Sequence, residues 1–178
     1  MSNSKMRNTV LIAVIAFLMA SVGSMLTAEE TFMSGEWAGS ACEAWNQDEE
    51  LTGNLTQWMK NDLDRGYKII QIYRMDCEDS PRVELRLEPA EEEGKIQCTY
   101  GGPAEAELDA KADYVMFAQT KRWEEMGAGN YGPMKGMMTR RLRFQGPKWE
   151  AMNNMGPFKN FLLLTGQIPG DTASCPAS

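Results

Sequence analysis

The chain has 178 residues, of which 43% are apolar, and carries a formal net charge of −7. So acidic a chain repels phosphate backbones, which argues against nucleic acid as a partner. Histidine is absent, so Ser-His-Asp and Cys-His catalysis are excluded and the most common metal ligand is missing. Catalysis by carboxylates is the alternative, but no acidic pair lies inside an apolar stretch, where a raised pKa would be expected. We therefore expect no enzyme activity, no metal site and no cofactor.

Residues 1–28 predict a signal peptide. Lys5 and Arg7 precede an apolar run over residues 10–20, and a small-residue cleavage site ends at Ala28. The run is shorter than the roughly 20 residues that span a bilayer, although an uncleaved N-terminal anchor is the alternative. Cleavage predicts a periplasmic or secreted protein.

The rest of the chain has the length of one domain. We expect that domain to occupy residues 29–170, followed by a loose polar tail over 171–178.

Four cysteines in an exported chain predict two disulfides. They are Cys42, Cys77, Cys98 and Cys175. Three pairings are open, and we favour Cys77–Cys98, which closes a loop among the strands, with Cys42–Cys175, which ties the tail to the first helix. A zinc site is the alternative, but no two cysteines have the close spacing of structural zinc ligands.

The first elements in chain order are helices. Ser34 and Asp48 are suited to cap two of them, and Arg65-Gly66 ends the helical region. The apolar faces of these helices carry Trp37, Ala41 and Trp45, and then Leu51, Leu55 and Trp58.

Strands follow over residues 67–75, 82–88, 95–100 and 112–118. The second alternates, with Val83, Leu85 and Leu87 facing inward and its charged residues, including Glu84, facing solvent. Gly101-Gly102-Pro103 is expected to break the third strand.

The C-terminal part begins with a helix over 120–126, a loop over 127–133 and a fifth strand over 138–145. Gly146-Pro147 opens a closing helix, which Gly156-Pro157 interrupts. Its apolar positions are Trp149, Met152, Met155, Phe158, Phe161, Leu162 and Leu164. These elements predict an α+β fold, a five-stranded and mainly antiparallel sheet with helices covering one face.

Residues 139–146, Thr-Arg-Arg-Leu-Arg-Phe-Gln-Gly, are followed by Pro147 and an amphipathic helix to Leu164. This stretch resembles the sterol carrier protein type two domain, also called the sterol-binding domain. Ala112-Asp113-Tyr114 and the helix around Trp123 are similar to the family's strand-then-helix crossover, and the resemblance covers residues from about 44 to 168. It implies a five-stranded sheet whose helices enclose an apolar tunnel for sterols, fatty acyl chains or other lipids.

Two features depart from the family pattern. The cysteines and the export signal indicate an exported bacterial member, and Arg140 stands where the family commonly has glycine. In a strand over 138–145, Arg140 shares the inward parity of Met138, Leu142 and Phe144. It either reaches water or pairs with an acid such as Glu124 or Glu125, or it receives an anionic head group at the tunnel mouth.

Seven of the 14 methionines fall between Met116 and Met155. Methionine adapts to irregular apolar shapes, which suits a site for hydrophobic ligands, although an ordinary core is the alternative. The expected lining comprises Met116, Trp123, Met126, Met134, Met137, Met138, Arg140, Met152, Met155, Phe158, Phe161 and Leu162.

The predicted function is noncovalent binding and carriage of a sterol, fatty acid or other lipid, with transient contact to a membrane or a transporter. The alternative is an accessory domain that fills its tunnel with its own side chains and binds a protein partner.

Overall fold

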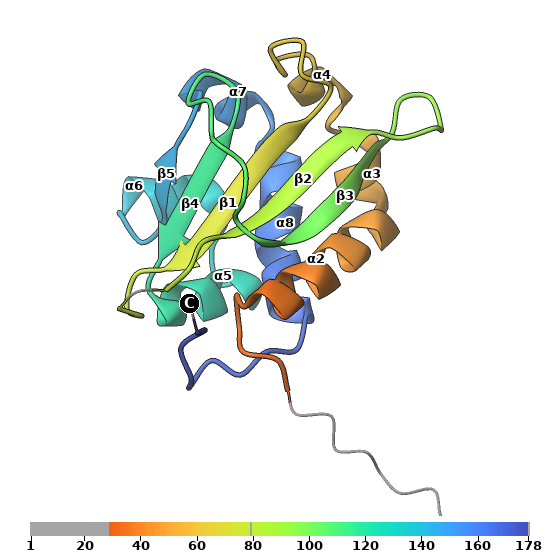
Figure 1. The fold of residues 1–178 in the computed structure, drawn as a ribbon. Helices are drawn as coiled ribbons and strands as arrows, with labels where there is room; N and C mark the ends of the chain where they lie inside the picture. The colour runs from red at the N-terminus through yellow and green to blue at the C-terminus, as the bar shows by residue number, and fades with distance from the viewer. Residues whose placement is uncertain (1–28, 79, 178) are drawn as a thin grey trace, which may run out of the picture.

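The computed structural model describes residues 29–78 and 80–177, so the predicted signal peptide lies outside the described residues. A five-stranded sheet carries helices on one face, as Figure 1 shows. The strands are β1 (Lys68–Arg74), β2 (Val83–Pro89), β3 (Ile96–Pro103), β4 (Tyr114–Ala118) and β5 (Arg143–Gln145). Their order is β3-β2-β1-β4-β5, and only the β1–β4 pair is parallel. The α+β class and the mainly antiparallel sheet are confirmed.

The first helices begin where their caps predict. The Ser34 hydroxyl accepts a hydrogen bond from the Trp37 backbone N–H, and Asp48 accepts one from Leu51 N–H. The second predicted helix is broken in two, because Gly53 and Asn54 are poor helix formers. The helices of this region are α2 (Gly35–Gln47), α3 (Glu49–Gly53) and α4 (Thr56–Met59).

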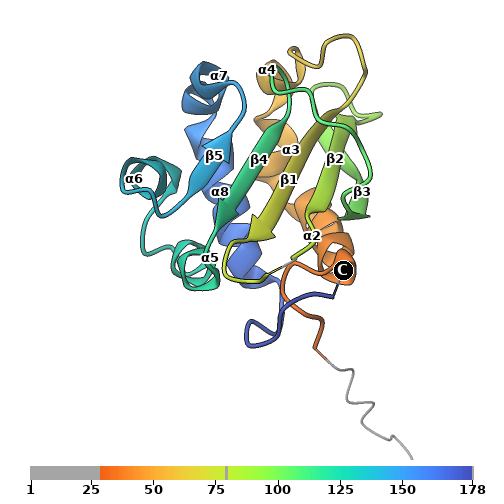
Figure 2. The ribbon, with the colours of Figure 1, turned by 60° about the vertical axis from the view of Figure 1, so that its left-hand side comes forward.

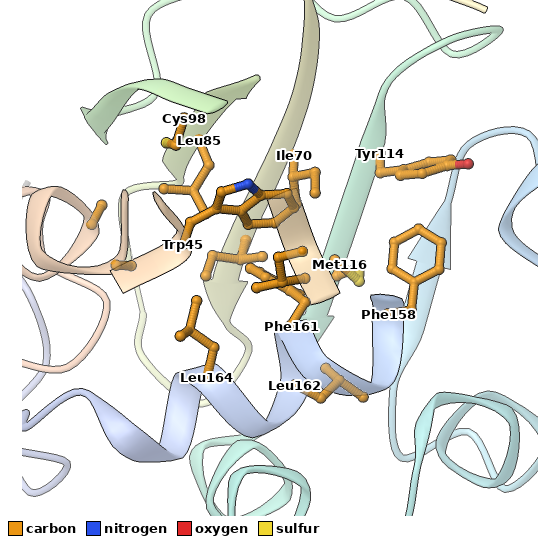
Figure 3. Packing of buried hydrophobic residues seen from close by; sticks show 14 of the residues in the cluster. Trp45, Ile70, Leu85, Cys98, Tyr114, Met116, Phe158, Phe161, Leu162 and Leu164 are labelled. Atoms are coloured by element: carbon orange, nitrogen blue, oxygen red, sulfur yellow. The ribbon is translucent and has the colours of Figure 1, made fainter. Parts of the chain in front are cut away.

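The core lies between the sheet and the helices α2 and α8 (Met155–Gln167). Figure 3 shows Trp45 and Phe161 at its centre, with Ile70, Leu85 and Met116 around them. The rings of Trp45 and Phe161 lie 6.1 Å apart. Over the described residues this layer holds packed side chains, and the expected tunnel stays a prediction.

Strand β3 continues through Gly101-Gly102-Pro103, so the expected break there is wrong. The glycine has a packing role instead: a Cβ at Gly101 would lie 2.1 Å from the Ala38 carbonyl oxygen of α2. Only a residue without a side chain lets α2 approach β3 so closely.

The disulfides are Cys42–Cys98 and Cys77–Cys175, so the favoured pairing is wrong. Because α2 packs across β3, Cys42 meets Cys98, while Cys77 lies just beyond β1 beside the C-terminal segment. That segment is anchored rather than loose. The buried Arg74 guanidinium donates hydrogen bonds to the carbonyls of Thr172 at 2.7 Å and Ser174 at 2.6 Å.

Part of the second face of the sheet is covered as well, which corrects the expectation that Glu84 faces solvent. The crossover between β3 and β4 passes over this face (Figure 1). Glu84 is fully buried there and accepts hydrogen bonds from the backbone N–H groups of Glu105 and Ala106. Arg86 forms an ion pair with it at 3.0 Å.

The C-terminal half contains more helix than expected. Its helices are α5 (Thr120–Gly127), α6 (Pro133–Met138), α7 (Lys148–Asn153) and α8. The closing helix breaks at Asn154 rather than at Gly156-Pro157, because Pro157 lies in the first turn of α8, where proline is tolerated. Trp149, expected on the buried face, is 75% exposed.

We predict that Gly101→Ala lowers the free energy of unfolding by about 2 kcal/mol or more, because the new methyl group collides with the backbone of α2. Gly39→Ala is the matched control: its Cβ would meet only an ordinary contact at 3.7 Å, and alanine raises helix propensity by about 1 kcal/mol. Urea unfolding of both variants measures the difference. Equal stability of the two would contradict this account of the α2–β3 packing.

Candidate functional site

An apolar pocket opens at the β5 edge of the sheet, between α6 and α7. Figure 2 shows these three elements together along one side of the molecule. The pocket has a volume of about 340 Å³. We call it the α6–α7 pocket, and it is lined by Met134, Met137, Arg140, Leu142, Arg143, Phe144, Lys148, Ala151 and Met152. Its interior is therefore apolar, and three cationic side chains belong to its lining.

A much smaller inner cavity, of about 10 Å³, lies next to the α6–α7 pocket. The two share Met137, Leu142, Phe144 and Ala151. The inner cavity adds Met116, Met155 and Phe158, which belong to the core or pack against it. The two compartments are therefore adjacent, and flexible methionine side chains belong to the lining of both.

The turn after α6 determines where Arg140 lies. The backbone N–H of Arg141 donates to the Gly136 carbonyl at 2.9 Å, and that of Arg140 donates to the Met137 carbonyl at 3.1 Å. This is the Schellman pattern that ends a helix, and its turning residue adopts the left-handed conformation usually given to glycine. Arg140 occupies that position with φ +58°.

This turn explains why the fifth strand is shorter than predicted. Residues expected at the start of a strand instead complete α6 and its cap, and only Arg143–Gln145 pair with β4. The inward parity inferred for Arg140 is therefore wrong, since Arg140 is exposed and lies outside the strand. Glu124 and Glu125, the acids considered as its partners, form no ion pair with it.

A polar hollow of about 310 Å³ adjoins the pocket. It shares Arg140 and Arg143 with the α6–α7 pocket and adds Arg122 and Arg141. Guanidinium groups bind carboxylates and phosphates through paired hydrogen bonds. The site thus combines an apolar compartment with a cationic one.

Helix α7, which supplies Ala151 to the pocket, is attached to the sheet by Glu150. The Glu150 carboxylate accepts hydrogen bonds from Lys68 Nζ at 2.6 Å and from the Tyr114 hydroxyl at 2.5 Å. Lys68 is fully buried, donates also to the Trp58 carbonyl, and lies over the Trp58 ring. Burial lowers the pKa of Lys68, while the hydrogen bond to Glu150 opposes that shift.

Tyr114 remains a hydrogen-bond donor to Glu150. Burial, assisted by the hydrogen bond to Glu150, raises the pKa of the Tyr114 phenol far above its usual range. The Tyr114 ring also contacts Phe158, at 5.2 Å between centroids, as Figure 3 shows. One carboxylate therefore connects the pocket wall to β1, β4 and the core.

The structure brings together about half of the expected lining. Four expected residues line the α6–α7 pocket, namely Met134, Met137, Arg140 and Met152. Three others line the inner cavity, namely Met116, Met155 and Phe158. Met138 lines a neighbouring groove along α6. The rest are buried core residues outside these pockets, namely Trp123, Met126, Phe161 and Leu162.

Five lining residues were not in the predicted set: Leu142, Arg143, Phe144, Lys148 and Ala151. The alternation of basic and apolar residues over 140–145 already indicated three of them, Leu142, Arg143 and Phe144. Lys148 and Ala151 are three residues apart on α7, so they share a helix face.

Across the described ranges, no cluster of acidic or cysteine side chains is arranged to hold a metal ion. Within the same ranges, no helix is both long and apolar enough to cross a bilayer.

Comparisons with known proteins give one family and one fold. A model of the SCP-2 sterol transfer family matches residues 49–159. No curated protein matches the chain significantly. A crystal structure of sterol carrier protein 2 has a TM-score of 0.51 and 17% identity, covering 76% of this chain and 98% of its own.

Two further solved structures are similar to a lesser degree. A conserved hypothetical protein from Thermus thermophilus has a TM-score of 0.46 and 16% identity, with 80% and 96% coverage of the two chains. The apo form of sterol carrier protein 2 from Yarrowia lipolytica has a TM-score of 0.39 and 12% identity, with 69% and 88% coverage.

We predict that Lys68 and Glu150 are energetically coupled. Lys68→Met leaves Glu150 without its cation, Glu150→Leu leaves a buried ammonium unpaired, and either change destabilises the fold. In the double variant neither charge remains. Its free energy of unfolding should therefore fall by about 1–3 kcal/mol less than the sum of the decreases in the two single variants. Urea unfolding of the four proteins measures the coupling. If the two single decreases simply add in the double variant, the ion pair does not attach α7 to the sheet.

Proposed function

Because the chain belongs to the SCP-2 sterol transfer family, we propose that it binds and carries a hydrophobic ligand in its α6–α7 pocket. Binding is noncovalent and is driven by the burial of apolar ligand surface, at about 25 cal/mol per Å². No catalysis, cofactor or metal ion is part of this proposal.

One observation carries the proposal. The apolar pocket at the β5 edge adjoins an inner cavity that reaches Met116 and Phe158. A volume of about 340 Å³ falls within the range of small-molecule sites, roughly 300–1,000 Å³. Methionines line both compartments, and rotation of their unbranched side chains would enlarge the space for a longer chain.

The adjoining arginines favour an amphiphile with an anionic head group. Its acyl chain would occupy the α6–α7 pocket while a carboxylate or phosphate meets Arg140 and Arg143, which belong to both the pocket and the polar hollow. Arg140 also holds the left-handed conformation, which costs a non-glycine residue about 1–2 kcal/mol.

The proposed address is the periplasm or the exterior of the cell. Two disulfides are compatible with an oxidising compartment. A carrier is useful there because a free acyl chain crosses water at a high cost in free energy.

The packed interior supports a second candidate, an accessory domain that binds a protein partner. Trp123, Phe161 and Leu162, which were expected to face the ligand, instead fill the layer between sheet and helices. Native mass spectrometry of protein from its host separates the candidates, because a carrier copurifies with lipid and an accessory domain does not.

Filling the α6–α7 pocket should abolish cargo binding. Ala151 lines both the pocket and the inner cavity and is 2% exposed, so Ala151→Phe places a ring inside them. We expect affinity for a fluorescent fatty acid to fall at least about tenfold. Ala110→Phe, at an exposed position in the β3–β4 crossover, is the control and should bind as the native protein does. Retained affinity in folded Ala151→Phe would exclude this pocket as the site.

The anionic head group is tested at Arg140. Arg140→Gln should weaken binding of a fatty acid by about 1.5–3 kcal/mol, the strength of a charge-assisted hydrogen bond, and leave the alcohol of equal length unchanged. Arg140→Gly should likewise lose its preference for the fatty acid over the alcohol. Its free energy of unfolding should rise by about 1 kcal/mol, because glycine tolerates the left-handed turn. Titration calorimetry and urea unfolding give the two readings. Equal losses for acid and alcohol would contradict the head-group role.

A further inference from the structure

The surface around the opening of the α6–α7 pocket exposes apolar side chains that a protein in water normally buries. Among the described residues six large apolar side chains are exposed, and four of them lie between Met134 and Met152. Met138 is 78% exposed and Trp149 is 75% exposed. Grouped exposed apolar residues of this kind mark an interaction surface.

The same region concentrates positive charge. Residues 132–159 contain six basic residues and a single acidic one, whereas the rest of residues 29–178 contains ten basic and 24 acidic residues. The single acid, Glu150, is already paired with Lys68. Five of the six cations are exposed and form no ion pair within the described ranges: Lys135, Arg140, Arg143, Lys148 and Lys159.

These groups form one continuous face. The α6–α7 pocket and the groove along α6 share Met134, and the groove brings in Lys135, Met138 and Lys159. On α7, Trp149 and Met152 are three residues apart and are therefore neighbours on the helix surface. Figure 2 shows α6, β5 and α7 along the same edge.

We propose that this face, which we call the α6–α7 face, docks on the surface of an anionic phospholipid bilayer. Tryptophan and methionine would enter the interfacial region while the lysines and arginines meet lipid phosphates. The acidic remainder of the protein is repelled by the same membrane, so docking is confined to this face. The inference rests on the proposed carrier function and extends it, because it places the pocket mouth directly against the lipid source.

Tryptophan fluorescence can report this docking specifically. The other four tryptophans, Trp37, Trp45, Trp58 and Trp123, are exposed by 1% or less. A blue shift and quenching by brominated lipid would therefore arise from Trp149. We expect both with vesicles that contain phosphatidylglycerol, and neither with vesicles of phosphatidylcholine alone. Raising the ionic strength should weaken the binding.

Matched variants locate the surface. Lys135→Gln should lower partitioning into the anionic vesicles about fivefold, whereas Lys95→Gln, at the turn between β2 and β3, should leave it unchanged. Trp149→Ser should lower partitioning at least about tenfold in a flotation assay. Trp149 lies outside the pocket lining, so Trp149→Ser should still bind the fluorescent fatty acid.

Three results would overturn the docking surface. These are equal binding to both kinds of vesicle, binding that Lys135→Gln and Trp149→Ser leave unchanged, or absence of binding by a protein that still takes up fatty acid. The last result would leave the carrier function intact. A dimer in sedimentation that Trp149→Ser dissociates would assign the α6–α7 face to a second copy of the chain instead.

Discussion

Lys68 carries an ammonium group into the layer between sheet and helices, and the arrangement of the pocket depends on how this charge is neutralised. Of its contacts, the ring and carbonyl of Trp58 solvate the cation, but only Glu150 supplies a negative charge. Glu150 lies on α7, a six-residue helix that is too short to be stable by itself. The outer wall of the pocket is therefore attached to the sheet through Glu150, by its ion pair with Lys68 and by the hydrogen bond from Tyr114.

The local sequence predicted the elements whose determinants are local. The caps at Ser34 and Asp48 and the alternation of β2 identify α2, α3 and one strand face correctly. The errors concern partners that are distant in sequence. The local sequence predicts that Gly101 breaks a strand, whereas the structure shows that α2 packs on it. It also predicts that Glu84 is solvated, whereas the crossover covers it. The disulfide pairing fails for the same reason, because α2 must first cross β3.

The location of the site was predictable from the sequence, but how far the pocket extends into the core was not. Methionines between Met116 and Met155 do surround the compartments at the β5 edge, as their concentration indicated. The large aromatic residues Trp123 and Phe161 do not line these compartments, because their side chains fill the core. The alternation of basic and apolar residues after Met138 is typical of a strand, yet backbone hydrogen bonds to Gly136 and Met137 make its first part a helix end.

The two disulfides interleave along the chain, since Cys77 lies between Cys42 and Cys98, and Cys175 lies beyond both. A peptide bond hydrolysed anywhere between Cys42 and Cys175 therefore leaves the two fragments covalently joined. The exposed turns around α6 and α7, which are of the kind that proteases cleave, all fall inside this interval. A nicked molecule would keep its pocket-forming segments tethered, so a single cut would not by itself separate the walls of the pocket from the sheet that positions them.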